Sequence, residues 1–367
     1  MNSLSKKIVV AAMSGGVDSS VAALLLKQQG YEVIGISMKT HESMENEGCS
    51  APSKTCCTVS DIMDARRVCQ LLDVPFYAMN YVEAFHDKVV DYFGREYAAG
   101  RTPNPCVACN HHLKFDALLK HARQLGAYYL ATGHYAQKIR DEQGMYRLLK
   151  SRDDHKDQTY FLYGLGQEQL EHTLFPIGHL TKDEVRDIAR RAGLKTADKP
   201  ESQEICFVPN NDYAGFIENH LPQYRGTPGD FVDEEGKVLG AHRGIHAYTV
   251  GQRRGLGVAT GDRVYVSAIL TEKNQVVLSS KESLLMKGFT TVENKWVNRE
   301  RVADGMEIEV KVRHRVTASP AFLLLETPQK VRVQFKSPEG AVTPGQSAVF
   351  YCGDEVLGGG FIEAGYR

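Results

Sequence analysis

The chain has 367 residues, more than one hydrophobic core usually organises, so two or three domains are expected. Its composition is 42% hydrophobic, 24% charged and 9% aromatic, as in ordinary globular proteins, and no apolar run is long enough to cross a bilayer. The formal net charge of −1 excludes a global basic field, so a nucleic-acid partner needs local basic patches. Met1–Lys7 lead into an apolar run too short for a signal peptide, and we expect a cytoplasmic protein without a membrane partner.

The first third alternates short apolar runs with segments of helical periodicity, which is typical of an α/β domain with a mainly parallel sheet. One helix is predicted where Ile62, Ala65 and Cys69 share an apolar face. Another begins with the capping box Thr181–Glu184 and ends at Gly193. The predicted strands are Ile8–Met13, Glu32–Met38, Pro75–Met79 and Tyr128–Thr132.

The pattern changes from about Asn210 onward. Residues 225–261 are rich in glycine, and later Met306, Ile308 and Val310 alternate strictly with charged residues. Alternation with period two indicates half-buried strands, so we expect a small Gly-rich central domain followed by an antiparallel β-barrel. The predicted domains are residues 1–208, 209–277 and 278–367.

A glycine-rich turn, Ser14–Ser20, directly follows the first predicted strand and precedes an apolar helix. Two glycines let backbone N–H groups approach an anion, and the helix directs its positive end to the same place. Asp18 fits such a site if it binds Mg²⁺ or caps the helix. A plain strand–helix turn is the alternative, and the Walker pattern is absent because no Gly-Lys-Ser/Thr occurs.

This turn closely resembles the Ser-Gly-Gly-x-Asp-Ser pyrophosphate (PP) loop of the ATP pyrophosphatase family. Members of that family cleave ATP between the α and β phosphates and adenylate a carbonyl oxygen. The resemblance implies an α/β PP-loop domain that uses ATP with Mg²⁺. It also implies that the nucleotide is bound by Ala12, Met13, Ser14, Gly15, Gly16, Val17, Asp18, Ser19, Met38 and Gly133.

Two of the eight cysteines form a Cys-x-x-Cys, Cys106 and Cys109, in a proline-rich loop just before a predicted helix. A helix N-terminus stabilises a thiolate, which favours reactive thiols. A zinc half-site remains an alternative because His111 and His112 follow, although no second Cys-x-x-Cys appears. Cys206, in a loop after the capped helix, is the candidate partner thiol.

The remaining cysteines have less distinctive settings. Cys69 is expected to be a core residue, and Cys352 to have a similarly structural role in the barrel. Cys49, Cys56 and Cys57 fall in a polar loop, where a metal site is the less favoured interpretation.

The chain resembles the bacterial tRNA-specific 2-thiouridylases along essentially its whole length. The stretches that carry this resemblance are Ala12–Ser20, Arg101–Phe115, Ala131–Tyr135, Lys156–Leu162, Ile205–Phe207, Tyr248–Gly257 and Pro344–Val349.

In that family an Asn-Pro-Asp-x-x-Cys-Asn motif carries the nucleophilic cysteine, which corresponds to Cys109 here. Cys206 matches the persulfide-bearing cysteine. Asn104, Pro105 and Cys106 match the segment that touches the target base, and Cys106 replaces the usual Asp, so the roles of the third thiol and of this contact stay open. Either Cys109 attacks the Cys206 persulfide and releases its outer sulfur, or the persulfide attacks the base first.

Three alternatives differ in cofactor or function. Cys106, Cys109 and Cys206 could instead hold a [4Fe–4S] cluster with one open iron. Another ATP pyrophosphatase, such as a tRNA-lysidine synthetase, would need an amine rather than paired cysteines. A tRNA-binding or thiol-redox module would bind nucleotide without releasing AMP and pyrophosphate.

The substrate implied by the resemblance is the wobble uridine 34 of Lys, Glu and Gln tRNAs, with sulfur from a cysteine desulfurase directly or through a sulfur carrier. A flipped base requires local contacts to the RNA. We expect Arg313 and His314 to lie on a barrel strand, with Arg253 and Arg254 as further basic candidates. The predicted tRNA contacts implied by the resemblance are His134, Lys156, Asp157, Gln158, Arg313, His314 and Gln346.

Overall fold

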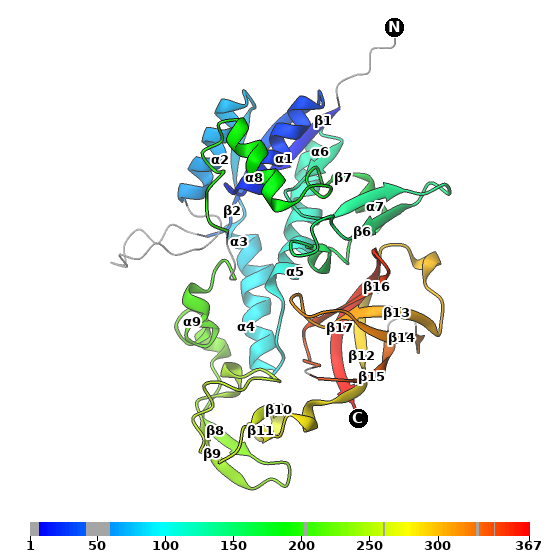
Figure 1. Ribbon diagram of the computed structural model, residues 1–367. Helices are drawn as coiled ribbons and strands as arrows, with labels where there is room; N and C mark the ends of the chain where they lie inside the picture. Colours follow the sequence, from blue (N-terminus) through cyan, green and yellow to red (C-terminus); the bar gives the residue numbers. More distant parts are fainter. Residues whose placement is uncertain (1–6, 42–58, 202–204, 260, 328–329, 341) are drawn as a thin grey trace. The chain divides into compact units, whose positions relative to one another are not determined.

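The computed structural model describes residues 7–41, 59–201, 205–259, 261–327, 330–340 and 342–367 (Figure 1). The chain forms two compact units. The first contains the residues up to Val89 together with Cys106–Asn211 and Asp354–Val356, and the second contains Val90–Pro105, Asp212–Gly353 and Leu357–Arg367. Within the described ranges, no helix combines the length and apolar character needed to span a membrane.

A five-stranded parallel sheet organises the first unit, with the strand order β3–β2–β1–β4–β7. This confirms the predicted α/β class, and the four predicted strands form within two residues of their expected limits. β7 was not predicted because two residues are too short to show a period. The strands are β1 (Ile8–Ala12), β2 (Glu32–Lys39), β3 (Phe76–Asn80), β4 (Tyr129–Ala131) and β7 (Thr173–Leu174).

Three helices share one hydrophobic core with the sheet (Figure 1). Val9 and Ala11 of β1 pack in a single cluster with Val21, Ala65 and Val185, one residue from each helix. The apolar face predicted for the second of these helices is therefore confirmed, and the third is the helix predicted to start at the Thr181 capping box. The helices are α1 (Val17–Gln28), α2 (Val59–Leu71) and α8 (Lys182–Arg191).

The rest of the first unit consists of short helices and a hairpin. β5 (Gln137–Arg140) pairs antiparallel with β6 (Tyr146–Leu149), and Glu355 and Val356 add to β6 on its other side. Its further helices are α3 (Val82–Phe85), the π-helical η1 (His86–Val90), α5 (Pro105–Cys109), the π-helical η2 (Asn110–Leu118), α6 (Leu119–Gln124) and α7 (Gln167–Glu171).

The second unit begins with α4 (Asp91–Ala98) and contains α9 (Tyr213–His220) beside a four-stranded sheet of order β10–β11–β8–β9. Phe231 and Val266 are fully buried in the core of this sheet. The strands are β8 (Gly229–Val232), β9 (Val238–His242), β10 (Tyr265–Leu270) and β11 (Gln275–Ser279).

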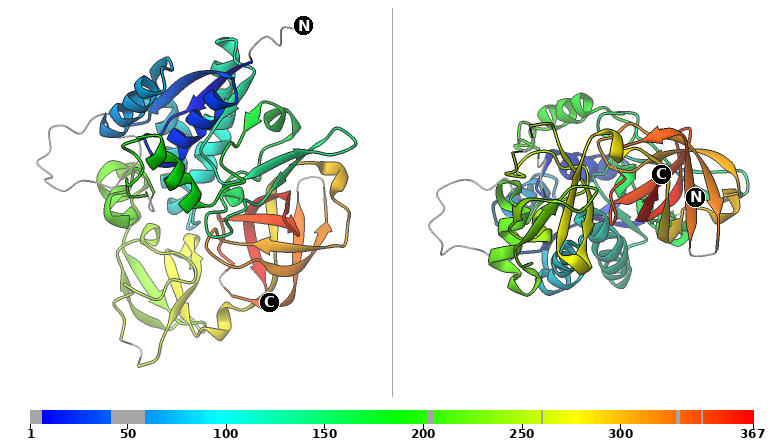
Figure 2. Two further views of the ribbon diagram at one scale, coloured as in Figure 1. Left: turned by 45° about the horizontal axis from the view of Figure 1, so that its top comes forward. Right: turned by 90° about the horizontal axis from the view of Figure 1, so that it is seen from below.

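Six antiparallel strands form the C-terminal barrel, which closes because β12 pairs with both β15 and β17. The views in Figure 2 show these strands curling around a common interior, where Phe289, Val310 and Val333 are buried. The predicted alternation and barrel are confirmed. The strands are β12 (Met286–Trp296), β13 (Met306–Lys311), β14 (Ser319–Leu325), β15 (Val331–Glu339), β16 (Ser347–Cys352) and β17 (Glu355–Tyr366).

Short 3-10 turns link several of these elements. They are Thr159–Phe161, Pro209–Asn211, Pro222–Tyr224, Ile245–Ala247, Thr271–Lys273, Glu282–Leu284 and Arg299–Arg301.

Candidate active site

The glycine-rich turn lies between β1 and α1, as predicted. Gly15 adopts a φ of +75°, and a Cβ added there would meet the carbonyl oxygen of Asp61 at 2.2 Å, so the position requires glycine. The Ser14 N–H donates to Ser19 Oγ over 3.2 Å, and Ser20 Oγ donates to the Gly16 carbonyl over 2.8 Å. The turn is therefore held in a fixed shape by its own hydroxyl groups and by close packing.

The turn occupies the edge of the sheet where ligands of open α/β folds bind. β1 lies between β2 and β4, so the connections that follow β1 and β4 leave in opposite directions, which makes this a topological switch point. Gly133, just after β4, approaches α1 so closely that an added Cβ would lie 2.6 Å from Ser19 N. The two predicted nucleotide segments are thus brought together.

The other predicted nucleotide residues flank this turn. Ala12 ends β1 and is half-buried, Met13 and Val17 are buried, and Met38 is half-buried near the carboxyl end of β2. Their roles toward a nucleotide stay predictions.

Asp18, at the start of α1, is the centre of a charged network. Its carboxylate accepts hydrogen bonds from Lys182 Nζ at 2.8 Å and from the Tyr135 hydroxyl at 2.9 Å. Lys182 Nζ also lies 2.8 Å from Glu201, which in turn accepts from Lys156 at 2.7 Å. The Lys182 side chain is only 9% exposed, so this ammonium group depends on its two carboxylates.

Burial and the neighbouring lysines have opposite effects on the pKa of the Glu201 carboxyl. Burial raises its pKa, but the hydrogen bonds and charges of Lys156 and Lys182 outweigh burial and lower the pKa to about 2. Burial and then the neighbouring Asp18 carboxylate raise the pKa of the Tyr135 phenol. Glu201 therefore stays ionised and Tyr135 protonated at neutral pH, which keeps the network intact.

A second lysine ties the glycine turn to α2. Lys199 Nζ donates to the carbonyl oxygen of Gly15 at 3.0 Å and to the carboxylates of Asp61 and Asp64 at 2.7 Å each. Burial lowers the pKa of Lys199, but the two carboxylates outweigh burial and raise it. Lys199 and Glu201 both precede Cys206 in the sequence, and both bond to residues beside the nucleotide turn.

The Cys-x-x-Cys lies within helix α5 and not, as predicted, in a loop before a helix. α5 begins at Pro105 and includes both cysteines, because proline is well tolerated in a first helical turn, where its missing N–H has no partner to lose. Cys106 is exposed and Cys109 half-buried. Next to Cys109, Asn110 is buried and donates to the Phe161 carbonyl at 3.2 Å, which fixes the helix in its unit.

Cys206 lies half-buried in a turn, as predicted for a thiol in a loop. The next residue, Phe207, is buried and packs edge-on against Phe85 of α3, with ring centroids 5.7 Å apart. The aromatic pair thus anchors the residue directly after Cys206.

The other cysteines divide into three cases. Cys69 is fully buried, and burial raises its thiol pKa to about 11, which confirms a core residue. Cys352 ends β16 of the barrel, where it was expected, and is exposed. Cys49, Cys56 and Cys57 lie outside the described residues.

The predicted tRNA-contacting residues of the first unit already form contacts within the protein. His134 is buried beside Phe115 and bonds to Thr132 at 2.8 Å, and burial, followed by the charge of Lys114, lowers its pKa well below the usual value. Asp157 is buried and accepts from the Thr159 hydroxyl at 2.8 Å, and Gln158 accepts from the Tyr135 N–H at 2.9 Å. Contacts of these residues with RNA stay predictions.

The barrel candidates also have intramolecular partners. Arg313 and His314 lie in the turn after β13 and not on a strand, because the alternation ends at Val312. Arg313 donates to the Val250 carbonyl at 2.8 Å, and Gln346 Nε2 donates to the carbonyls of two residues of the loop before α5. Arg253 and Arg254 are exposed.

Among the residues described, which include Cys106, Cys109 and Cys206, no three His, Cys, Asp or Glu side chains are grouped as metal ligands. The three-thiolate cluster considered as an alternative stays a prediction.

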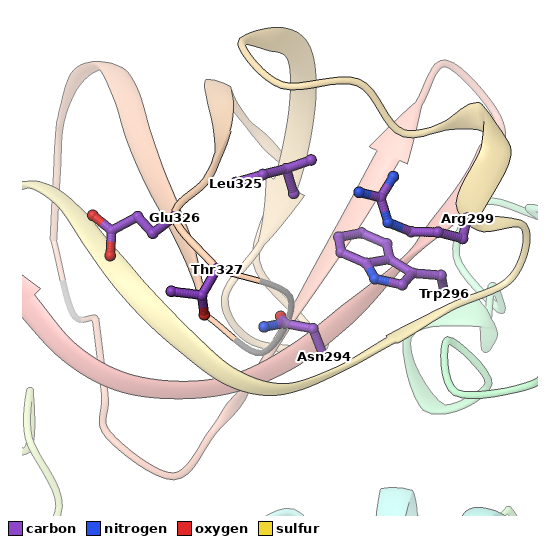
Figure 3. A pocket seen from close by; sticks show the side chains of 6 residues that line it. All are labelled: Asn294, Trp296, Arg299, Leu325, Glu326 and Thr327. Carbon is purple, nitrogen blue, oxygen red and sulfur yellow. The ribbon is translucent and has the colours of Figure 1, made fainter.

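A hollow of about 560 Å³ opens on the barrel, and none of the residues that line it is a predicted site residue (Figure 3). The Arg299 guanidinium lies over the Trp296 ring, 5.8 Å from its centroid, beside Asn294 and Leu325. Arg299 already donates to the Val302 carbonyl at 2.7 Å. The Arg299 side chain is therefore already held by contacts within the barrel.

Sequence reasoning missed Lys182, Lys199, Glu201 and Tyr135 as site residues. Lys182 was noted only within a capping box, and Thr181 does cap α8 with Glu184 as its reciprocal partner. A basic residue in the first turn of a helix opposes the helix dipole, and this was the available signal that Lys182 has a special charge environment.

Three family models match the chain in succession. They are a tRNA methyl transferase HUP domain over residues 6–210, a tRNA methyl transferase PRC-barrel domain over 214–280 and an aminomethyltransferase beta-barrel domain over 286–362. Among solved structures, the chain is similar to NMN synthetase from Francisella tularensis, with a TM-score of 0.33 and 16% identity over 59% of this chain and 77% of that one. A 4-thiouridine synthetase–RNA complex with bound ATP gives 0.37 and 15% identity over 59% and 51%, and likenesses this remote do not bear on function.

Curated relatives match over nearly their full length. The chain is 49% identical over 364 residues to the tRNA-specific 2-thiouridylase MnmA of Clostridium acetobutylicum, which covers 98% of this chain and 100% of that protein. It is 48% identical over 371 residues to the enzyme of the same name from Geobacter metallireducens, covering 99% of each. At almost half identity from end to end, and with the three domain models in the same order, the chain belongs to the family of tRNA-specific 2-thiouridylases.

Proposed function

We propose that this protein is a tRNA-uridine 2-sulfurtransferase, which uses ATP to replace the C2 oxygen of wobble uridine 34 with sulfur and releases AMP and pyrophosphate. One observation carries the proposal beyond the family relationship. Two residues that precede Cys206 in the sequence bond beside the glycine turn: Lys199 donates to the Gly15 carbonyl, and Glu201 pairs with Lys182. An ATP site whose supports lie so near the reactive thiol in the sequence suits a reaction that needs both.

The first half of the reaction is adenylation of the C2 oxygen. That oxygen is a poor leaving group, and transfer of AMP to it makes AMP the leaving group instead. The N–H groups of the turn and the N-terminus of α1 would hold the phosphates. Mg²⁺ would supply charge neutralisation, and Asp18, whose side chain is 31% exposed, suits it because Mg²⁺ commonly takes one protein carboxylate together with phosphates.

The second half is sulfur transfer. In one order, the Cys109 thiolate attacks the inner sulfur of a Cys206 persulfide, forms a Cys109–Cys206 disulfide and releases the outer sulfur as hydrosulfide. Hydrosulfide then attacks C2, and AMP leaves. In the other order, the persulfide attacks C2 first and Cys109 resolves the adduct. In both, an external thiol must reduce the disulfide before the next cycle.

The substrates and partners complete the proposal. The tRNAs are those for Lys, Glu and Gln, and the sulfur comes from a cysteine desulfurase or a carrier, in the cytoplasm. Asn104, Pro105 and Cys106 would face the base, and the three predicted domains, 1–208, 209–277 and 278–367, would supply the further contacts. Because Cys106 is exposed, it is open to modification, and a Cys106→Ala variant separates an essential thiol from a bystander.

The proposal is tested with purified protein, tRNA, ATP and a persulfide-generating desulfurase. Nucleoside mass spectrometry should find 2-thiouridine, and one AMP should form for each thiolated nucleoside. Omitting ATP should abolish the product. If 2-thiouridine accumulates without AMP, adenylation is not part of the reaction, and if neither forms with any tRNA, the proposed function is wrong.

A further inference from the structure

A turn of the barrel holds the loop that joins α4 to α5. Gln346 Nε2 donates to the carbonyl oxygens of Thr102 at 2.9 Å and of Pro103 at 3.0 Å, while the Thr102 N–H donates to the Pro344 carbonyl at 2.9 Å. All of these residues belong to the second unit. We call Pro344, Gly345 and Gln346 the clamp, because they bind three consecutive polar groups of this loop.

The clamp is itself rigidly mounted. Gly345 adopts a φ of +87°, and a Cβ added there would lie 2.9 Å from Thr102 N, so only glycine allows this approach. The Gly345 N–H donates to the Ile362 carbonyl at 2.9 Å, and the Ile362 N–H donates to the Gln346 carbonyl at 2.8 Å. The clamp is thus fixed to β17 of the barrel.

The loop is also held at its beginning. Arg101 forms two 2.6 Å hydrogen bonds to the Glu96 carboxylate, and Thr102 Oγ1 lies 3.1 Å from Thr249 Oγ1. The clamp then holds Thr102 and Pro103. Asn104 comes next, and Pro105 is the first residue of α5, so the clamp fixes the backbone immediately before the helix that carries Cys106 and Cys109.

The chemistry of Gln346 suits positioning better than a simple surface contact. A glutamine amide has two N–H donors, and each is directed at one loop carbonyl. We propose that Gln346 is a positioning residue for sulfur transfer: through the loop it sets how the start of α5 presents Cys109 to the target uridine. This rests on the proposed function and assigns Gln346 a role other than direct tRNA contact.

Two variants of Gln346 and one control test the proposal. Gln346→Glu keeps the shape but directs carboxylate oxygen at two carbonyl oxygens, and Gln346→Met keeps the length without donors. Gln334→Glu makes the same charge change on an exposed position of β15. For each protein we would measure Cys109 alkylation by iodoacetamide without tRNA, using peptide mass spectrometry, then tRNA affinity and single-turnover thiolation at saturating tRNA.

Both Gln346 variants should change the Cys109 alkylation rate in tRNA-free protein, while the control should not. Single-turnover thiolation should fall by about tenfold or more, since small misplacements of a reacting group have such effects, and tRNA affinity should change little. Unchanged alkylation in both variants overturns the proposal, as does weaker tRNA binding with a normal single-turnover rate. A wild-type protein that forms no 2-thiouridine refutes the proposed function instead, and alkylation still tests the clamp.

Discussion

The nucleotide turn and the cysteine segments are built on different principles. Around the turn, Asp18, Lys182 and Lys199 are engaged in short ion pairs, and Gly15 is packed against α2. The two candidate catalytic cysteines are instead half-buried, and their positions are set by neighbouring residues: Phe207 and Asn110 are the buried anchors.

The difference indicates how the chain divides its task. A phosphate site gains from fixed dipoles that need no rearrangement when charge develops. A sulfur that must leave one cysteine and reach a base needs access, so its precision comes from the buried residue next to each cysteine. Substitutions in the turn should therefore affect nucleotide use first, and substitutions of the cysteines should affect sulfur transfer alone.

The largest expected effect is from the cysteines. Cys109→Ser or Cys206→Ser should lower 2-thiouridine formation by about 10³-fold or more, as removal of a catalytic nucleophile commonly does. Equilibrium binding of ATP should remain normal, because neither side chain belongs to the turn. Nucleoside mass spectrometry and ATP titration measure the two effects, and a matching loss of ATP binding would contradict the division.

Lys182→Ala should have the next largest effect. It leaves the carboxylates of Asp18 and Glu201 without their shared ammonium group. Breaking a buried ion pair costs about 3–5 kcal/mol. Because both carboxylates are partly exposed to solvent, the cost here should be smaller. We expect kcat/KM for ATP to fall by about 10²-fold. Lys195→Ala, an exposed lysine of the same unit, is the matched control and should behave as wild type.

A pair of glycine variants tests the packing of the turn. Gly15→Ala forces a left-handed conformation costing about 1–2 kcal/mol and places Cβ against the Asp61 carbonyl, so ATP affinity should fall by about tenfold or more. At Gly16, the nearest neighbour of an added Cβ is Ser14 Oγ at 3.6 Å, which is an ordinary van der Waals contact. Gly16→Ala should therefore lose less ATP affinity than Gly15→Ala. Equal losses for both would show that packing against α2 is not what shapes the turn. Isothermal titration calorimetry gives both affinities.

The smallest predicted effect concerns stability and pH. His134 is held neutral because burial, and then Lys114, lowers its pKa, so the unfolded chain takes up a proton that the folded chain does not. Below about pH 6.5 stability should therefore fall, with a slope approaching about 1.4 kcal/mol per pH unit for this one group. Denaturant unfolding between pH 7.5 and 5 measures the slope, and His134→Asn should reduce it. An unchanged slope in that variant would assign the loss to other groups.

Sequence periodicity predicted the elements that bury apolar faces. The four longer strands of the parallel sheet, the capped helix at Thr181 and the alternation of β13 all follow from side chains at regular spacing. The strand–turn–helix at Ser14–Ser20 was visible because two glycines leave a local mark. Local chemistry was sufficient in each case.

Long-range partners were not visible in the sequence. Lys182 lies 164 positions from Asp18 in the sequence, and Gln346 lies 244 positions from Thr102. Periodicity does not predict contacts between residues so far apart in the sequence. The position of Arg313 was wrong because alternation predicts a strand but not where it ends. Pro105 shows the limit of composition: two nearby prolines predicted a loop, although one of them starts a helix.

The central claim is that ATP use and the two thiols serve one reaction, and trapping the disulfide tests it most directly. Wild-type protein loaded with persulfide sulfur is mixed with tRNA and ATP, quenched with an alkylating reagent, digested without reductant and analysed by mass spectrometry. The account predicts a peptide pair joined through Cys109 and Cys206 that appears in step with 2-thiouridine and only when both ATP and tRNA are present. If 2-thiouridine forms while both cysteines are recovered separately alkylated at every time point, the sulfur relay is contradicted.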